Sequence, residues 1–518
     1  MAGASSTSTD LRRDDSLLVR VLNGIAVAGN KLPHPFWLFL IIGGLVLLLS
    51  WVFAGASAVS PADDEEIVVQ SLLTEQGLRD IIVEAVPNFV AFPPLGIIIA
   101  VMLGVSVAER AGLISAAIRT VVTRVRPRWL TFTLALTGVT GSVASDAIYV
   151  VLIPLGAMVF KAVGRSPILG AIVAFGSASA GYNASLVVIP TDTLLAGLTT
   201  SAARLVEPGY VVSPIANYFF SAASAVVLAA IVTLVTETVL VRTTRNLTED
   251  EESASRDGDG EEEVLRVETH ERQGLKRAAA TLVIALALLA VALAVPASPF
   301  RGPDGGVLTS PLVEGVAVVI ALLFVLVGVV YGRTVGTITG PRDIPRFMAD
   351  GVRELAPIVV LFFAAAQFVA YFEWSNLGPL LAVRGAEVLE SAQLPTIVLA
   401  GGVVLLVCLM NLFITSGSAQ WTLMAPVLVP MLMLVGMSPE VTQMLFRMGD
   451  SPTNIISPMS PYFALALGYL QKYRSSAGIG TLLSLTLPLS IAILVGWFLF
   501  FLLWYAVGLP LGPGVPVR

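Results

Sequence analysis

The sequence predicts an all-α integral membrane protein with nine transmembrane helices and two re-entrant hairpins, arranged as inverted repeats with broken helices. The first observation is composition: 56% of the residues are hydrophobic and 13% are charged, whereas soluble globular proteins average about 25% charged residues. The second is length, because apolar runs such as 36–56 and 278–295 approach the roughly 20 residues that cross a bilayer. The third is an internal repeat.

The repeat consists of matched polar interruptions in the two halves of the chain. Equivalent residues recur at spacings of 13 and 7 positions: Gly141 to Pro154 and Gly417 to Pro430, then Asn183 to Pro190 and Asn454 to Pro461. Backbone broken by Gly, Ser or Pro is tolerated at membrane depth only where protein or a water-filled cavity satisfies its polar groups. One such set in each half therefore predicts the substrate site of a secondary transporter.

Lysine and arginine residues gather in alternate loops, which gives the orientation of the first half. The polar segment 1–35 contains four basic residues and is placed in the cytoplasm; it has no apolar h-region and no cleavage site, so we expect no removable signal peptide. The first transmembrane half, 36–241, follows with these elements: spans at 36–56 and 88–108, a hairpin at about 129–160, a broken helix at about 168–200, and a span at 211–241.

An acidic cytoplasmic linker, 242–277, separates the halves, and the second half, 278–508, is expected to repeat the order with opposite orientation. Its expected elements are spans at 278–295, 312–331 and 355–372, a hairpin at about 396–435, a broken helix at about 441–470, a span at 481–507, and then a tail, 509–518. Full crossings instead of hairpins would leave the charge pattern unchanged, but the Gly-Ser tips and nearby prolines favour re-entrance. We expect the two tips to meet near the membrane centre.

Several function classes find no support. Cys408 is the only cysteine, which excludes a disulfide framework, and the two histidines, His34 and His270, lie outside the apolar runs. The sequence lacks HExxH, GxSxG and P-loop motifs and has no soluble domain large enough to bind ATP. We therefore expect neither an enzyme nor a nucleic-acid-binding protein.

Ionisable groups inside apolar segments are costly and usually mark transport pathways, and four stand out: Asp146, Asp192, Arg447 and Asp450. Arg447 and Asp450 are three positions apart, so they can pair on one helical face. Either this pair is structural, or Arg447 binds a substrate carboxylate while Asp450 holds it in place or carries a proton. Asp192 has no basic neighbour in sequence and is either the proton carrier or a residue at the rim of a wet cavity.

Asn183 and Asn454 stand at the matched breaks, and an amide offers donors to a substrate and an acceptor to a cation. Free carbonyls at such breaks suit Na⁺, and half-helix N-termini suit anions. The expected Na⁺ site comprises Ser142, Asp146, Asn183 and Asn454. At the second tip, Ser418 either binds a ligand or permits close packing, and Trp421 is expected to stack on an aromatic substrate.

Three strings in this sequence resemble the AbgT family of p-aminobenzoyl-glutamate transporters. They are AGYNA at 180–184 followed by Asp192, SGSAQW at 416–421, and FRMGDSPTN at 446–454. The resemblance covers roughly 16–509 and implies a homodimer with nine transmembrane helices and two hairpins. It also implies transport of p-aminobenzoyl-glutamate or export of sulfonamide antimetabolites, coupled to protons, with Na⁺ as a second candidate.

The family's site positions that the resemblance carries over are Asp192, Ser418, Trp421, Pro439, Arg447 and Asp450. A glutamyl carboxylate suits Arg447, and an aromatic amine suits Trp421. We therefore expect a secondary active transporter in a bacterial inner membrane, with its N-terminus in the cytoplasm and no cofactor beyond a coupling cation. The alternatives are a Na⁺-coupled carrier of another small carboxylate and a channel, and no motif decides between import and export.

Overall fold

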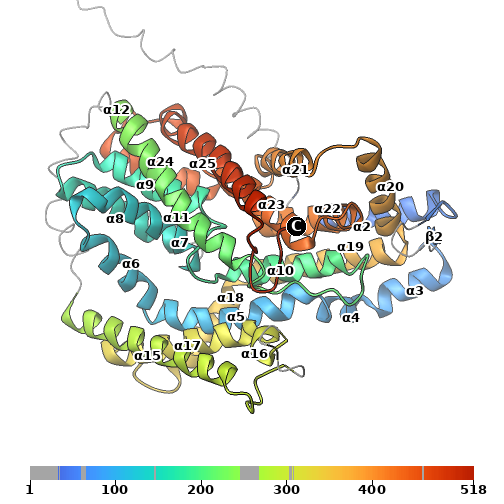
Figure 1. The fold of residues 1–518 in the computed structure, drawn as a ribbon, viewed down its shortest axis with the longest axis horizontal. Coiled ribbons are helices and arrows are strands. Elements are labelled where there is room, and N and C mark those ends of the chain that lie inside the picture. The colour runs from blue at the N-terminus through green and yellow to red at the C-terminus, as the bar shows by residue number, and fades with distance from the viewer. Residues whose placement is uncertain are drawn as a thin grey trace, which may run out of the picture.

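The structure is a computed structural model that describes residues 33, 35–59, 66–144, 147–244, 268–302, 306, 309–457 and 460–518. Within these residues the regular structure is almost entirely helical (Figure 1). The exception is one short hairpin of β1 (Ser57–Val59) and β2 (Glu66–Val68), which pair antiparallel. The predicted all-α class is confirmed; this small hairpin was not predicted from the sequence.

The first half contains helices at each expected span and at the expected hairpin. In chain order they are α2 (Pro35–Val52), α3 (Glu75–Val83), α4 (Ala85–Val90), α5 (Pro93–Arg110), α6 (Leu113–Thr123), η1 (Pro127–Trp129), α7 (Leu130–Thr140), η2 (Gly141–Ala144), α8 (Ala147–Ala162), α9 (Pro167–Ala180), α10 (Pro190–Ala203), α11 (Tyr218–Val235), η3 (Thr236–Leu240) and α12 (Val241–Thr244). The turn η3 is a π-helical widening near the end of the long α11–α12 helix.

The second half begins with α15, whose first turns occupy part of the predicted linker. Its helices are α15 (Thr269–Ala294), α16 (Pro311–Glu314), α17 (Val316–Val335), α18 (Asp343–Glu354), α19 (Ala356–Trp374), α20 (Leu377–Ser391), α21 (Thr396–Asn411), α22 (Gly417–Leu434), α23 (Pro439–Thr453), α24 (Pro461–Tyr473) and α25 (Ile479–Val507). The remainder of the predicted linker, 245–267, and most of the N-terminal segment lie outside the described residues.

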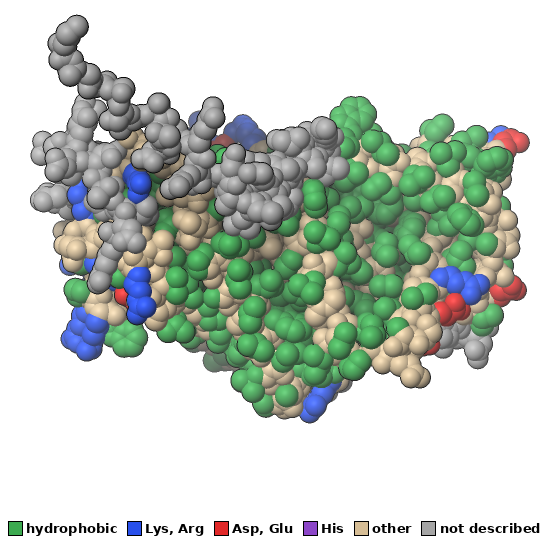
Figure 2. All heavy atoms as spheres, turned by 90° about the horizontal axis from the view of Figure 1, so that it is seen from above, with side chains coloured by type: hydrophobic (Ala, Val, Ile, Leu, Met, Phe, Trp, Pro, Cys, Tyr) green, Lys and Arg blue, Asp and Glu red, His purple; other side chains and the backbone are tan. Residues whose placement is uncertain are grey.

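Eight helices of the described chain are long and apolar enough to cross a membrane, by length and composition. Helix α15 is the most exposed, since only 6% of its apolar window is buried. Figure 2 shows a broad apolar face with charged side chains gathered towards its two ends. Apolar surface on this scale indicates contact with lipid. The count of nine spans and the re-entrance of the hairpins stay predictions.

The first hairpin, α7 and α8, packs along α9, and this contact depends on glycine. A Cβ at Gly156 of α8 would lie 2.6 Å from the carbonyl oxygen of Gly170 on α9. A Cβ at Gly138 of α7 would lie 2.0 Å from the hydroxyl of Ser177. Small residues thus let the hairpin backbone approach α9 closely, as at other helix contacts in membranes.

The two broken helices, α9–α10 and α23–α24, are interrupted at the predicted positions. Each second part starts with a proline, Pro190 or Pro461, at a position where the missing N–H costs nothing. Inside α23, Pro452 removes a backbone donor one residue before the helix ends. The parts of α9–α10 contact those of α23–α24, so the interruptions of the two halves meet.

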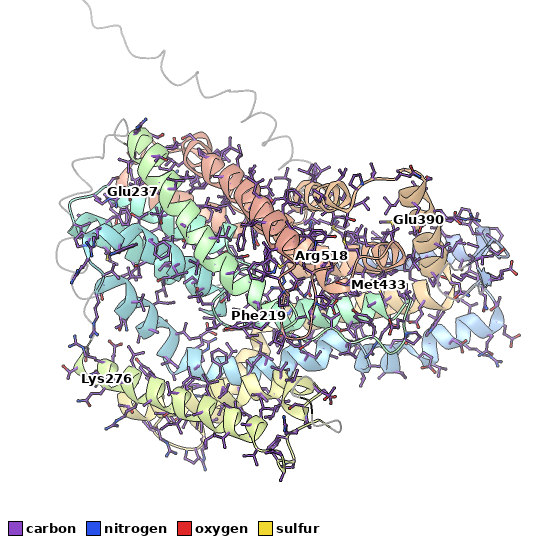
Figure 3. The ribbon with its side chains drawn as sticks, in the orientation of Figure 1. Phe219, Glu237, Lys276, Glu390, Met433 and Arg518 are labelled. Atoms are coloured by element: carbon purple, nitrogen blue, oxygen red, sulfur yellow. The ribbon has the colours of Figure 1, made fainter. Side chains whose placement is uncertain are left out.

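Two further features were not predicted. Helix α20 connects α19 to the second hairpin, where only a loop was expected between 372 and 396. The tail 509–518 is packed, because Leu511 and Val517 are buried and the carbonyl of Leu511 accepts the N–H of Phe220 at 3.0 Å. Phe219 and Arg518 accordingly lie in the middle of the molecule in Figure 3.

Candidate functional site

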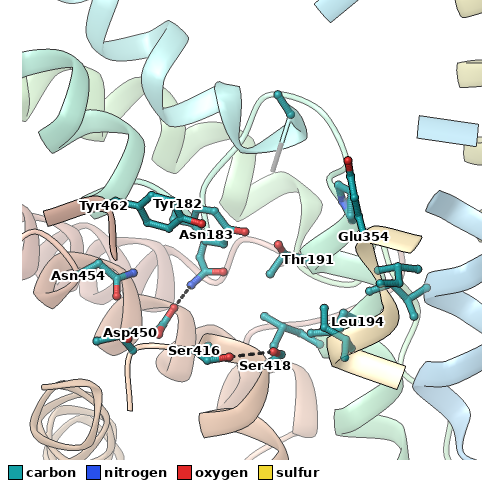
Figure 4. Close-up of a pocket in the computed structure, with 18 of the residues that line it drawn as sticks. Tyr182, Asn183, Thr191, Leu194, Glu354, Ser416, Ser418, Asp450, Asn454 and Tyr462 are labelled. Carbon is teal, nitrogen blue, oxygen red and sulfur yellow. Dashed lines mark hydrogen bonds between the residues drawn. The ribbon is translucent and has the colours of Figure 1, made fainter. Parts of the chain in front are cut away.

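A cavity of about 580 Å³ lies where the two interruptions and the second hairpin tip come together (Figure 4). Its walls come from α5, α8, α10, α23 and α24, from the junction of α18 and α19, and from the tip before α22. Asn183, Ser418, Asp450 and Asn454, all predicted site residues, line it. Ala144 and Tyr149, which flank the first tip, line it as well. Both hairpins and both breaks therefore contribute to one cavity.

Three helices begin at the cavity wall. Thr191 in the first turn of α10, Gly417 and Ser418 in the first turn of α22, and Tyr462 in the first turn of α24 line it. The N-terminal ends of these helices, with their positive dipole ends, therefore lie next to the cavity. This arrangement favours an anionic group on the ligand.

The two halves are joined in this cavity by a hydrogen bond between predicted site residues. The side-chain N–H of Asn183 donates to Asp450 Oδ2 at 2.6 Å, and the backbone N–H of Asn183 donates to Ser451 Oγ at 3.2 Å. The tip of the second hairpin closes on the same carboxylate, since a Cβ at Gly417 would lie 3.2 Å from Asp450 Oδ2. Asp450 is thus the point where the two breaks and one tip meet.

Arg447 does not pair with Asp450 as predicted. Its Nη1 donates to Asp192 Oδ1 at 2.5 Å, and both side chains are buried. Asp192 Oδ2 in turn accepts the backbone N–H of Ile189 at 2.8 Å, which holds the carboxylate at the start of α10. The spacing within α23 allowed a local pair, but the fold brings a carboxylate from the other half directly against the guanidinium. Asp192 therefore does have a basic neighbour, which no local sequence pattern shows.

Neither Arg447 nor Asp192 lines the cavity in this conformation. Arg447 is 1% exposed, and its Nε has no hydrogen-bond partner among the described residues. The ion pair instead connects α23 to α10 immediately behind the cavity wall. The prediction that Arg447 contacts substrate directly does not describe the state seen here.

Asn411, at the end of α21, was missed in the sequence. Its side-chain nitrogen donates to the carbonyl of Asp450 at 2.6 Å, to Thr453 Oγ1 at 2.8 Å and to Asn454 Oδ1 at 2.9 Å. It therefore ties the second hairpin to the second break. Its position in the sequence could have identified it as a site residue, because it is the polar residue that ends the apolar run 396–410 before the hairpin tip.

Three buried acceptor oxygens at the two breaks have no hydrogen-bond partner among the described residues: Asn183 Oδ1, Asn411 Oδ1 and Asp450 Oδ1. Unpaired buried acceptors are costly unless a donor or a cation satisfies them. Oxygen atoms of this kind can coordinate a hard cation or accept a hydrogen bond from a protonated group. No cluster of three or more His, Cys, Asp or Glu residues that could hold a metal occurs in the described part of the chain.

Only part of the predicted Na⁺ site lies at the cavity. Ser142 is buried, donates to the carbonyl of Val139 at 3.3 Å, and does not line the cavity. Asp146 lies outside the described residues. Asn183 and Asn454 are both at the cavity wall.

Comparison with known proteins identifies the family. The family model of the AbgT transporters matches residues 20–518. The chain belongs to the AbgT family. It is 36% identical over 493 residues to the p-aminobenzoyl-glutamate transport protein of Escherichia coli K12, covering 95% of each chain. The protein is therefore a membrane transporter and not an enzyme.

Solved AbgT structures share this fold. The YdaH transporter of Alcanivorax borkumensis is 41% identical, with a TM-score of 0.87 over 93% of this chain and 100% of that chain. MtrF of Neisseria gonorrhoeae, described as representing a class of antimetabolite efflux pumps, is 41% identical, with a TM-score of 0.89 over 96% of this chain and 100% of that one.

Two further AbgT positions carried over by resemblance, besides Asp192 and Arg447, do not line the cavity. Trp421 is fully buried, its indole N–H donates to Thr199 Oγ1 at 2.9 Å, and its ring lies 4.5 Å from that of Phe446. Phe446 lines the cavity, so Trp421 supports the wall from behind and does not stack on a ligand in this state. Pro439 is the first residue of α23, where it fixes the start of the helix.

Proposed function

We propose that this AbgT transporter is a secondary active transporter of p-aminobenzoyl-glutamate, of sulfonamide-type antimetabolites, or of both, coupled to a cation. The observation that carries the proposal is the cavity at which both breaks and both hairpins contribute residues around Asp450. A site built from matching elements of two inverted repeats suits alternating access, in which one half moves against the other around a fixed centre.

The substrate class follows from the cavity and from the relatives. The positive ends of the helices that begin at the cavity wall favour a carboxylate or sulfonyl group on the ligand. Such a group can therefore bind there without an arginine side chain in the cavity. The Escherichia coli relative carries the name of p-aminobenzoyl-glutamate, and MtrF represents antimetabolite efflux pumps. A ligand with an aromatic body and an anionic end fits both the names and the chemistry of the wall.

We assign coupling to Asp450 in place of Asp192. Asp192 already has a counter-charge in Arg447, whereas Asp450 is bonded to a neutral amide and keeps one oxygen without a partner among the described residues. A proton on Asp450, or Na⁺ held by Asp450, Asn183 and Asn411, would neutralise this carboxylate. Since Asp450 touches elements of both halves, its neutralisation would change how they associate.

The proposal also includes the orientation of the chain in the membrane and its oligomeric state. We infer from the basic loops that the N-terminus is cytoplasmic, and we propose a bacterial inner membrane as the location. In that orientation the cavity extends towards the cytoplasmic ends of α5 and α18, where Glu109 and Glu354 line it. The AbgT resemblance further favours a homodimer.

The test is transport by the purified full chain in proteoliposomes, with proton and Na⁺ gradients imposed separately. Labelled p-aminobenzoyl-glutamate and a labelled sulfonamide are the two probes. Accumulation against a substrate gradient, with counterflow when unlabelled substrate is present on the opposite side, is the expected result. Flux without counterflow would indicate a channel, and no flux of either probe, with activity towards another small carboxylate, would overturn the substrate assignment.

A further inference from the structure

Two tyrosine rings stack on each other at the wall of the cavity. The ring centroids of Tyr149 and Tyr462 are 3.9 Å apart and the ring planes differ by 10°. Tyr149 belongs to α8 in the first hairpin, and Tyr462 to α24 in the second broken helix, so the stack joins the two halves. Both residues line the cavity, as does Tyr182 beside Asn183.

The two partners differ in exposure. Tyr149 is 2% exposed, whereas Tyr462 is only partly buried. Tyr149 therefore covers one face of Tyr462, and what remains accessible on Tyr462 is available to the cavity. Figure 4 places Tyr462 and Tyr182 together at one end of the cavity, near Asn454, with Thr191, Leu194 and Glu354 towards the other end.

The stack also breaks the symmetry of the repeat. Tyr149 lies eight positions after Gly141, and the residue eight positions after Gly417 is Ala425. Tyr462 lies eight positions after Asn454, and the residue eight positions after Asn183 is Thr191. The backbone plan of the site is therefore duplicated, but the two tyrosines have an alanine and a threonine as their counterparts. A cavity with tyrosine rings at one end and the hydroxyl groups of Thr191, Ser416 and Ser418 elsewhere on its wall matches a ligand that has an aromatic ring and a polar end.

We propose that Tyr462, backed by Tyr149 and flanked by Tyr182, is the subsite that binds the aromatic ring of the substrate. The inference rests on the proposed function, because it assumes that an aryl-bearing anion enters this cavity. The rings of Tyr149 and Tyr462 are too close to admit a third ring between them, so the substrate ring packs against the part of Tyr462 that borders the cavity. Tyr149 acts as a positioning residue that fixes the plane of Tyr462.

This assignment replaces Trp421 as the aromatic contact. Trp421 has no exposed surface and packs against Phe446, so a ligand in the cavity cannot reach its ring. With its ring on Tyr462, a bound substrate would point its anionic end towards Thr191, Gly417 and Ser418, where α10 and α22 begin. The two ends of the ligand are thereby recognised by different elements.

The test compares p-aminobenzoyl-glutamate with its cyclohexanecarbonyl analogue, in which a saturated ring replaces the aromatic ring, by equilibrium binding to the full chain in detergent. Aromatic pairs contribute beyond buried area by an amount that corresponds to roughly a 2- to 12-fold preference for the aryl probe. We expect wild type and Tyr462→Phe to show this preference and Tyr462→Leu to lose it. Tyr149→Leu should reduce it, because the plane of Tyr462 is no longer fixed.

Tyr371→Leu is the matched control, since Tyr371 packs against Trp374 on α19 and does not line the cavity. It should keep the wild-type ratio of affinities. If Tyr462→Leu does not fold, Tyr462→Met supplies the non-aromatic variant. A wild-type ratio retained in the folded non-aromatic variant, or both affinities falling equally, would overturn the aryl subsite. Failure of wild type to bind either probe would instead overturn the proposed function on which the subsite rests.

Discussion

Replacing Asp192 with asparagine removes the carboxylate that pairs with Arg447 and leaves the buried guanidinium without a directly bonded counter-charge. The Arg447 and Asp192 side chains are 1% and 9% exposed, and Arg447 also donates a long hydrogen bond of 3.5 Å to the carbonyl of Asn183. Breaking a buried pair by removing one partner typically costs about 3–5 kcal/mol. We expect Asp192→Asn to lower the stability of the folded protein by an amount of this order.

The double variant Asp192→Asn, Arg447→Met distinguishes an ion pair from a simple loss of packing. Removing both charges leaves no unpaired ion, so the double variant should unfold at a higher temperature than Asp192→Asn alone. The exposed pair of Glu75 and Arg79 provides the control, and Glu75→Gln should change stability by less than about 1 kcal/mol.

The assay is thermal unfolding of the purified protein in detergent, followed by intrinsic fluorescence and by retention of the monodisperse species. An Asp192→Asn variant as stable as Glu75→Gln would contradict the ion pair. So would a double variant whose loss equals the sum of the two single losses.

Three more changes test the site and its scaffold. In a Cys408→Ser background, Ser418→Cys should react with a hydrophilic thiol reagent, and p-aminobenzoyl-glutamate should slow the reaction because residue 418 lines the cavity; permanent protection would count against an accessible tip. Gly156→Val should disrupt hairpin packing, because a Cβ there would lie 2.6 Å from the carbonyl of Gly170; normal folding and transport would refute the close approach. Trp421→Ala should cost about 3–5 kcal/mol of stability, as for other fully buried large side chains, and a change in substrate binding at unchanged melting temperature would show that Trp421 contacts the ligand after all.

The sequence predicted those features whose cause is local. Runs of apolar residues indicated membrane helices, and the prolines and glycines at matching spacings indicated the breaks at 181–189 and 454–460, because these residue types interrupt helices wherever they occur. The residues that were predicted for the site and do line the cavity lie at or beside these breaks or the second hairpin tip: Asn183, Ser418, Asp450 and Asn454.

Features that depend on the meeting of distant elements could not be predicted in the same way. The spacing of Arg447 and Asp450 suggested a local pair, but the three-dimensional arrangement of α10 and α23 presents Asp192 to Arg447. Likewise, nothing within the chain near Trp421 shows that Phe446 stands between its ring and the cavity. Helix α20 was missed because its mixture of apolar and charged residues lacks the long apolar run by which the membrane spans were found.

The central claim is that Asp450 couples cation movement to substrate movement. The measurement that tests it most directly is transport by Asp450→Asn in proteoliposomes, with accumulation and exchange recorded on the same preparation. Asparagine keeps the size of the side chain and its acceptor oxygen for Asn183, but it can neither release a proton nor supply a negative charge to Na⁺. We predict that exchange of labelled for unlabelled p-aminobenzoyl-glutamate persists, whereas accumulation driven by a proton or Na⁺ gradient is lost. Gradient-driven accumulation at the wild-type level would contradict the account.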